Sequence, residues 1–365
     1  MEQKIKALLA RIVHPESGRN IVESGMVEHI DAGEGRVIVM TVSLGVSAAA
    51  ADQTGAAQAE GPLGIVSAMS VELNALVEAT KISKTEEIAG NTFYEGVLNG
   101  VDVVLVKAGI GKVLAVASGK GGVGKSTVTA NLALTLRNMG YRVGILDADI
   151  YGPSQPKMFG VEGYLPDAER IDGEDCILPA DAMGIKLMSI GFFIKPTDAL
   201  LWRGAMAVSA LKQMIHQTRW GTLDFLLTDL PPGTGDVHLS IIGELKIDAA
   251  VIVSTPQQIA VADVVRGVEM FRNENVNIPV AGIVENMAWF TPAELPENRY
   301  YIFGRGGARA YAEKSGVEFL GEIPIIQSIM DGADAGTPAA GIDSRVEEHY
   351  RGIAEKIVGK VMKNG

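Results

Sequence analysis

The feature that most constrains this chain is a glycine-rich phrase at residues 119–126, GKGGVGKS. It matches the pattern G-x-x-x-x-G-K-S/T, follows the apolar run VLAVAS, and precedes TVTANLALTLRNMG, which has helical periodicity. In this context backbone N–H groups turn inward around phosphates, and the start of the helix adds partial positive charge. The phrase therefore predicts a nucleotide site in which Lys125 bridges the β- and γ-phosphates and Ser126 holds Mg²⁺.

A second glycine phrase, GIGK at residues 109–112, lies a few residues earlier. It lacks the spacing of the first phrase and leads into a strand instead of a helix. We expect a tight connection between two strands here, with no bound phosphate.

From Val113 onward, apolar strands alternate with segments of helical period. The expected strands are VLAVAS, RVGILDAD, LDFLLTDL, AAVIVST, IPVAGIV and VEFLGEI, and a last helix is expected over Arg345–Met362. This alternation is typical of an α/β fold with a mostly parallel sheet and helices on both faces. We expect residues 113–365 to form this domain.

The first 112 residues have a different organisation. Residues 1–44 predict part of a small α+β domain, with a helix over Gln3–Ile12 and a strand over Arg36–Ser43. Residues 45–62 are small and polar, which is typical of a linker, although a short Ala-rich helix is the alternative. Residues 63–112 predict a β-α-β-β segment.

Composition limits the function classes. The net charge of −12 argues against a protein that coats nucleic acid, and no apolar run reaches the ~18 residues of a membrane span. The start of the chain lacks a signal peptide pattern, and the single cysteine, Cys176, excludes an intrachain disulfide. We therefore expect a cytoplasmic protein.

Carboxylates follow two of the expected strands. Asp147 and Asp149 end one strand, and Asp229 ends another. An open α/β sheet binds its ligand at the carboxyl ends of its strands, so Asp149 and Asp229 are candidate site residues beside the glycine-rich loop. A carboxylate at a strand end is also often a turn former or a helix cap, and this alternative stays open for Asp147.

Lys120 makes the loop more specific. The phrase KGGVGKS resembles the deviant Walker A ATPases of the MinD/ParA/Mrp group, which are P-loop NTPases. The resemblance implies that Lys120 reaches the partner's ATP across a homodimer, that Asp149 acts on the attacking water, and that Asp229 holds Mg²⁺ with Ser126. The implied catalytic residues are Lys120, Lys125 and Asp149. The implied ATP-binding residues are Gly119, Lys120, Gly121, Gly122, Val123, Gly124, Lys125, Ser126, Thr127, Gly233 (in the switch segment Pro232–Gly235) and Asn286, whose amide would pair with adenine.

Further phrases narrow the resemblance. DADIYGPSQPKMFG, the WRG phrase at 202–204, TDLPPGTGD, STPQ and GEIPI together look like the Mrp/ApbC proteins, over about Val113–Lys360. Those proteins are iron–sulfur cluster carriers with ATPase activity that serve apoproteins, and residues 1–44 are similar to the small domain that commonly precedes them. The resemblance implies ATP and Mg²⁺ as cofactors and a 4Fe-4S cluster as cargo.

The chain departs from the carrier pattern at the cluster ligands. The family's C-x-x-C pair after the GIVENM strand is replaced by WFTPAELPENRYYIFGRGG, which has no cysteine. A cluster typically needs four soft thiolate ligands, whereas two copies of Cys176 supply two. Either the cluster is held otherwise, or the chain does different work, and the alternative is a positioning ATPase like MinD or ParA.

Residues 63–113 carry a separate resemblance, to the opening of methylthioadenosine/S-adenosylhomocysteine nucleosidases. Glu72 falls at the acidic active-site position of that family. The later glutamate and aspartate segments of the nucleosidases have no counterpart here, and an acid catalyst needs its partners within reach of the substrate. Nucleosidase activity is therefore the least favoured reading, and release of adenine would test it.

Overall fold

The computed structural model describes residues 27–31, 37–41, 63–67, 77, 80–88, 91–98, 101–107, 109–171, 174–193 and 204–363. The chain divides into two compact units. Unit 1 comprises residues 1–111 and 220–224 with Gly365, and unit 2 comprises residues 112–219 and 225–364. The expected helix over Gln3–Ile12, the expected linker, Glu72, Trp202 and Arg203 all lie outside the described residues.

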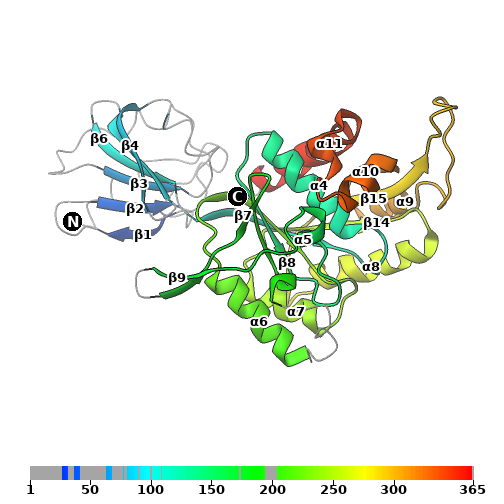
Figure 1. The fold of residues 1–365 in the computed structure, drawn as a ribbon, viewed down its shortest axis with the longest axis horizontal. Coiled ribbons are helices and arrows are strands. Elements are labelled where there is room, and N and C mark those ends of the chain that lie inside the picture. The colour runs from blue at the N-terminus through cyan, green and yellow to red at the C-terminus, as the bar shows by residue number, and fades with distance from the viewer. Residues whose placement is uncertain are drawn as a thin grey trace. The chain divides into compact units, whose positions relative to one another are not determined.

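Unit 1 contains one six-stranded sheet in the order β1-β2-β3-β6-β5-β4 (Figure 1). Its strands are β1 (Val27–Asp31), β2 (Val37–Thr41), β3 (Leu63–Ser67), β4 (Lys81–Ile88), β5 (Asn91–Leu98) and β6 (Val101–Lys107). Strands β2, β3 and β6 pair in parallel, whereas β4, β5 and β6 form an antiparallel meander. Strands from both sides of residues 45–62 therefore join one sheet.

The predictions for unit 1 are met in part. The expected strands of residues 63–112 correspond to β3, β5 and β6, and the strand expected near residues 36–43 corresponds to β2. β1 and β4 were not predicted. The sequence of β4, KISKTEEI, has four charged residues among eight and little apolar alternation. The helix expected over 71–80 lies outside the described residues except at Val77 and Thr80. The domain boundaries stay a prediction.

Unit 2 contains an eight-stranded sheet in the order β11-β12-β8-β13-β7-β14-β15-β16. Its strands are β7 (Ile110–Ala117), β8 (Val143–Asp147), β11 (Ala180–Ala182), β12 (Ile185–Ser189), β13 (Leu223–Asp229), β14 (Ala249–Ser254), β15 (Val280–Phe290) and β16 (Phe319–Ile325). The pairs β12–β8, β8–β13, β7–β14, β14–β15 and β15–β16 are parallel. Every residue of β8, β13 and β14 is buried, which explains their continuous apolar runs.

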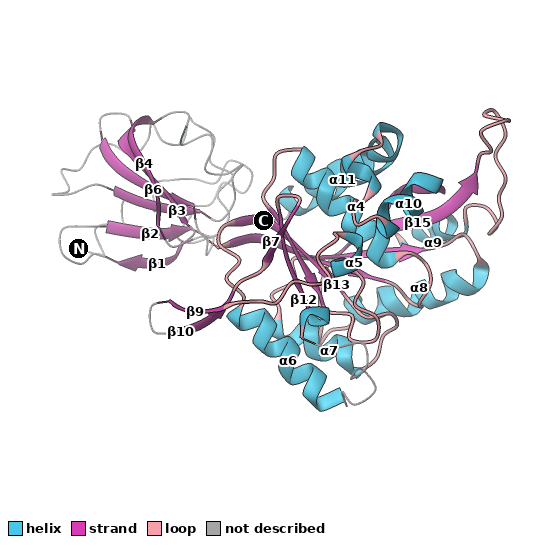
Figure 2. Cartoon of the chain, in the orientation of Figure 1, coloured by secondary structure: helices cyan, strands magenta, loops and turns pink. Residues whose placement is uncertain are grey.

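Helices connect these strands and cover both faces of the sheet (Figure 2). They are α4 (Lys125–Asn138), α5 (Gln155–Met158), α6 (Gly204–Gln217), α7 (Asp236–Glu244), α8 (Gln258–Arg272), α9 (Gly307–Ser315), α10 (Gln327–Asp334) and α11 (Ser344–Lys363). Figure 1 shows α4 and α11 on one face and α6 and α7 on the other. The predicted α/β fold class of residues 113–365 is confirmed.

The strand predictions for unit 2 hold, with additions. All six expected strands are present, and β15 runs six residues beyond its expected end, to Phe290. The hairpin of β9 (Ala168–Ile171) and β10 (Glu174–Ile177), and the edge pair β11–β12, were not predicted. These short strands lack a long apolar run, so the sequence gives a weak signal for them.

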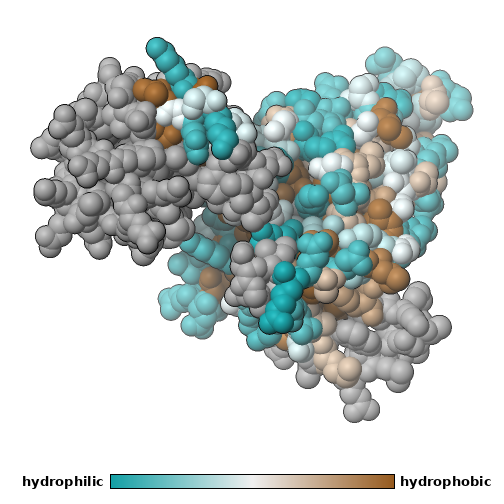
Figure 3. Space-filling model, turned by 60° about the vertical axis from the view of Figure 1, so that its left-hand side comes forward, coloured by the Kyte–Doolittle hydropathy of each residue, from teal (hydrophilic) through white to brown (hydrophobic). Residues whose placement is uncertain are grey.

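The last helix, α11, matches its expected range closely. It buries Ile353, Ile357 and Val361 against unit 2, so its apolar side is covered. On the face shown in Figure 3, hydrophobic residues of this unit are scattered among hydrophilic ones. Within the described ranges, no helix has the length and apolar character needed to cross a membrane.

Candidate functional site

The glycine-rich loop occupies residues 118–124, between the end of β7 and the start of α4. Gly122 and Gly124 both have φ of +81°, in the left-handed region that favours glycine. Gly124 is the residue that precedes the first turn of α4. The predicted strand–loop–helix arrangement is therefore present.

The loop is closed on one side and open on the other. A Cβ atom on Gly124 would overlap Nδ2 of Asn286, and a Cβ on Gly119 would overlap the carbonyl oxygen of Asp263 in α8. In contrast, a Cβ on Gly122 would meet nothing within 4 Å. The backbone thus packs tightly against the protein at Gly119 and Gly124 and faces open space between them.

The inner surface of this loop consists of hydrogen-bond donors. Among the residues that the structure describes, no group accepts a hydrogen bond from the backbone N–H groups of residues 121–127. The first intrahelical bond is from Val128 N to the Gly124 carbonyl. A run of free amides at a helix N-terminus has the geometry for binding phosphate oxygens. The residues present therefore fit the phosphates of a nucleotide.

Lys125 lies at the centre of a polar cluster. Its Nζ atom is 2.5 Å from Oδ1 of Asp229, 3.1 Å from Oγ of Ser126, and 3.8 Å from Oδ2 of Asp149. The side chain is only 6% exposed. The structure therefore brings together Lys125, Ser126, Asp149 and Asp229, as the sequence predicted.

Asp229 is held on both carboxylate oxygens. Oδ1 accepts from Thr129 Oγ1 at 3.2 Å as well as from Lys125, and Oδ2 accepts from Nε2 of Gln155 at 2.9 Å. The hydroxyl of Ser126 and the carboxylate of Asp229 are hard oxygen ligands of the kind that Mg²⁺ prefers. This pair fits a magnesium ion.

Gln155 is a site residue that the sequence reasoning missed. Its Nε2 atom donates to both Asp229 and the carbonyl of Ser126, at 2.9 and 3.0 Å, while its Oε1 atom is buried without a hydrogen-bond partner. Gln155 lies within the phrase DADIYGPSQPKMFG, but nothing in its spacing indicated a role. It positions the two candidate magnesium ligands relative to one another.

Asp147 lies beside Asp229, because the register of β8 and β13 pairs the two residues. Its Oδ2 accepts from Ser189 Oγ at 2.9 Å and from the backbone N of Gln155 at 3.1 Å. Burial and the nearby Asp229 raise the pKa of Asp147 to about 7. Asp147 therefore anchors the start of α5 and is a structural neighbour of the site.

Asp149 is more accessible than Asp147. Its Oδ1 accepts from the backbone N of Tyr151 at 3.2 Å. Burial raises the pKa of Asp149, although Lys125 opposes this effect. A carboxylate with a raised pKa is a better proton acceptor, which suits a residue that contacts an attacking water.

The other expected nucleotide contacts lie around the loop. Lys120 is half-buried, and within the described chain its ammonium group has no hydrogen-bond or ion-pair partner. The N–H of Gly233 donates to the Ser118 carbonyl at 2.9 Å, and Nδ2 of Asn286 donates to the Val123 carbonyl at 2.9 Å. The contacts of Gly233 and Asn286 with ATP stay predictions, and here these groups hold the loop.

The earlier phrase at residues 109–112 forms a connection, as expected. Gly109 has φ of +75° between β6 and β7. Lys112 is 3.3 Å from Asp248, whose other oxygen accepts from the backbone N of Val113. Lys112 therefore forms an ion pair with Asp248.

Thiolate ligands for a cluster are scarce. Cys176 is a free, half-buried thiol in β10. Across the described positions, no group of three or more His, Cys, Asp or Glu side chains is arranged to hold a metal. The segment after β15 contains no cysteine.

Comparisons with known proteins agree with this geometry. The family model of the NUBPL iron-transfer P-loop NTPases matches residues 109–358, and the model of an iron–sulfur cluster assembly protein matches residues 2–64. An "Iron-sulfur cluster carrier protein" from Aquifex aeolicus is 45% identical over 260 residues, 70% of this chain and 69% of that protein. An "Iron-sulfur cluster transfer protein NUBPL" from Dictyostelium discoideum is 43% identical over 253 residues, 68% of this chain and 76% of that protein.

Among solved structures, a nucleotide-binding protein from Archaeoglobus fulgidus in complex with ADP is similar to this chain. It has a TM-score of 0.54 and 41% identity, and the match covers 66% of this chain and 90% of that one. The loop geometry, the sequence matches and this structural match agree. The chain belongs to the family of NUBPL iron-transfer P-loop NTPases.

Proposed function

We propose that the chain is an Mg²⁺-dependent ATPase that works as a homodimer and carries iron–sulfur clusters to apoproteins. The observation that carries the ATPase part is the run of amides at residues 121–127, which have no acceptor among the described residues, beside Lys125, Ser126 and Asp229. The carrier part is supported by family membership and by the names of the relatives.

In this proposal, Lys125 exchanges Asp229 for phosphate oxygens when ATP binds. The carboxylate of Asp229 and the hydroxyl of Ser126 then serve as magnesium ligands, and Gln155 keeps Asp229 in place. Asp149 accepts a hydrogen bond from the attacking water. Lys120, whose ammonium group is unpaired in the described chain, would reach the nucleotide of the partner subunit.

A magnesium ion, when bound, neutralises charge on the phosphates. The residues of this chain supply the rest of the chemistry by position: the amides orient the phosphates, and Asp149 orients a water molecule. A cation delivered by a partner subunit at the developing charge contributes about 10³–10⁵ in rate in related nucleotide hydrolases.

Cluster carriage is the part of the proposal for which this chain offers fewer ligands than a cluster usually needs. A homodimer contributes two Cys176 thiolates, whereas iron–sulfur clusters typically take four. We propose that clusters are held with ligands other than a C-x-x-C pair. The variant Cys176→Ser distinguishes whether the thiol takes part.

One anaerobic preparation tests both parts. ATP hydrolysis should depend on Mg²⁺ and vanish in Lys125→Ala, while Lys314→Ala, at an exposed lysine of α9, should keep it. Reconstitution with iron and sulfide should give bound iron with visible absorption. Hydrolysis that persists in Lys125→Ala would remove the loop assignment, and hydrolysis without any bound iron would remove the carrier role alone.

The alternative of a positioning ATPase that binds membranes gains no support from α11, whose apolar residues Ile353, Ile357 and Val361 are buried. Sedimentation with liposomes in the presence of ATP would reveal such a function.

A further inference from the structure

A cavity of about 320 Å³ lies in unit 2, near the end of β15. Its walls carry two aromatic rings, Trp289 and Tyr301, and three arginines, Arg299, Arg305 and Arg309. The volume is at the small end of the range for small-molecule sites. None of these residues belongs to the nucleotide site described above.

Each of the three arginines is stacked on an aromatic ring. The guanidinium carbon lies 4.3 Å from the Trp289 ring centre for Arg299, 4.8 Å from the Tyr301 ring centre for Arg305, and 4.2 Å from the Phe319 ring centre for Arg309. Stacking uses the flat face of a guanidinium and leaves the N–H groups at its edge available. Three cationic groups thus lie around one space, each over an aromatic ring.

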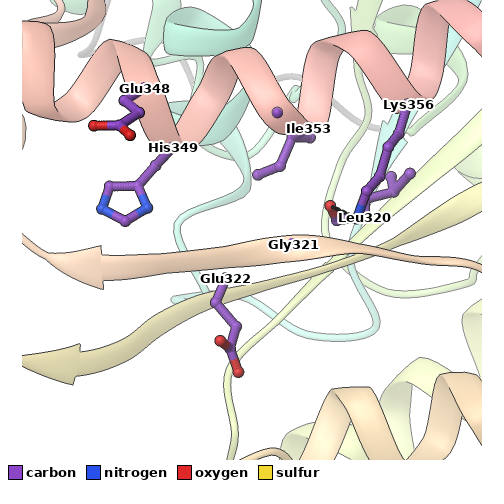
Figure 4. Close-up of a pocket in the computed structure, with 8 residues that line it drawn as sticks. Leu320, Gly321, Glu322, Glu348, His349, Ile353 and Lys356 are labelled. Carbon is purple, nitrogen blue, oxygen red and sulfur yellow. Dashed lines mark hydrogen bonds between the residues drawn. The ribbon is translucent and has the colours of Figure 1, made fainter.

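The local charges do not balance. Arg309 is 3.3 Å from Glu322, but Arg299 and Arg305 have no ion pair or hydrogen bond with any described residue. Figure 4, a view of the neighbouring cavity between β16 and α11, shows Glu322 on the opposite side of the strand from Glu348 and His349. Glu322 is half-buried, and among the described residues that line the arginine cavity it is the one carboxylate.

The other carboxylate nearby, that of Glu285, already accepts hydrogen bonds from the backbone. Glu285 is buried, and its two oxygens accept from the backbone N of Gly306 at 3.2 Å and of Ala308 at 2.7 Å. Glu285 thereby caps the N-terminus of α9 and offsets its partial positive charge. The helix end is therefore not the source of the cavity's positive charge. The excess charge comes from the two unpaired arginines, in a chain whose net charge is −12.

We propose that this cavity binds a small oxyanion with two or more negative charges, a polycarboxylate or a phosphate. Guanidinium edges bind carboxylate and phosphate oxygens with paired, charge-assisted hydrogen bonds. The stacked rings fix the arginines beforehand, which lowers the entropy lost when the ligand binds. The inference is independent of ATP hydrolysis, because it uses no residue of the loop.

Isothermal titration calorimetry on the full chain at low ionic strength tests the proposal, with citrate and inorganic phosphate as separate probes. At least one probe should bind, and the response to the two probes identifies the type of oxyanion. Arg299→Gln and Arg305→Gln should each weaken binding by ~10-fold or more, the size expected for hydrogen bonds to a charged group. Arg351→Gln, at an exposed arginine of α11 paired with Glu347, should leave binding unchanged.

The loop at residues 118–124 also attracts phosphate, so the titrations are repeated in Lys125→Ala. Binding that persists there and is lost in the arginine variants supports the proposal. Arg305→Lys keeps the charge but not the planar edge, so partial loss in this variant indicates a bidentate contact, and circular dichroism verifies folding. The proposal is overturned if neither probe binds, or if binding disappears in Lys125→Ala and survives in the arginine variants.

Discussion

Asp147→Asn isolates the cost of burying a carboxyl group beside Asp229. The pKa of Asp147 is raised from 3.8 to about 7, first by burial and then by Asp229. The folded chain therefore binds this proton more tightly than the unfolded chain. The stabilisation is complete below about pH 4 and is lost as the pH rises toward about 7.

The magnitude follows from these two pKa values. Each pH unit corresponds to about 1.4 kcal/mol, so the full loss is about 4 kcal/mol, of which about 3 kcal/mol falls between pH 5 and pH 8. Asparagine cannot ionise, so the variant lacks this fall. Its amide replaces an oxygen that accepts a 3.3 Å hydrogen bond from the backbone N of Asp149, which costs about 1 kcal/mol at every pH.

Urea unfolding followed by circular dichroism at pH 5, 6, 7 and 8 measures the difference between the two proteins. We expect the free energy of unfolding of the variant, relative to the natural chain, to rise by about 3 kcal/mol over this range. Because the chain has two compact units, only the transition that the substitution shifts is compared.

Asp175→Asn is the matched control, since the Asp175 side chain is 80% exposed and pays little for burial. Its difference from the natural chain should stay constant with pH. If the Asp147→Asn difference is also constant from pH 5 to pH 8, Asp147 is ionised throughout, and the reasoning from burial is refuted.

Three further substitutions have definite expected outcomes. Gln155→Met removes the hydrogen bonds to Asp229 and to the Ser126 carbonyl, so the Mg²⁺ concentration for half-maximal hydrolysis should rise about 10-fold, while an unchanged value would contradict the positioning role. Gly124→Ala places a Cβ against the Asn286 amide that holds the Val123 carbonyl, at φ of +81°, so nucleotide binding measured by calorimetry should weaken. Gly140→Ala, at φ of +93° in open space, should keep binding, and equal loss in both would contradict the steric argument. Lys120→Ala should keep ATP binding but slow hydrolysis ~10³-fold, and a normal rate would exclude the role of this lysine in the partner site.

Much of unit 2 could be predicted from sequence because its strands are buried on both faces. Runs such as AAVIVS are apolar throughout, so they indicate buried strands directly. The loop at residues 119–126 has the G-x-x-x-x-G-K-S/T spacing and lies between an apolar strand and a helical segment. The strands of the β9–β10 hairpin were missed, because four-residue strands such as AERI and EDCI carry little periodic signal.

The site was predicted to the extent that its residues belong to motifs. Lys125, Ser126, Asp149 and Asp229 lie together as expected. Gln155 could not be predicted, because its contact with Asp229 spans 74 positions and depends on how α5 packs. The arginine–ring contacts were also missed, and that of Arg309 with Phe319 forms only after α9 packs against β16.

The hydrogen bond from Asn286 to the Val123 carbonyl has a mechanical consequence. It tethers the end of the loop nearest α4 to β15, the strand that also carries Trp289 beneath Arg299. Any rearrangement of the loop must either break this tether or pull on the strand that runs to the arginines. Nucleotide binding at the loop and oxyanion binding at the arginines would then be coupled through the four residues 286–289 and a single amide.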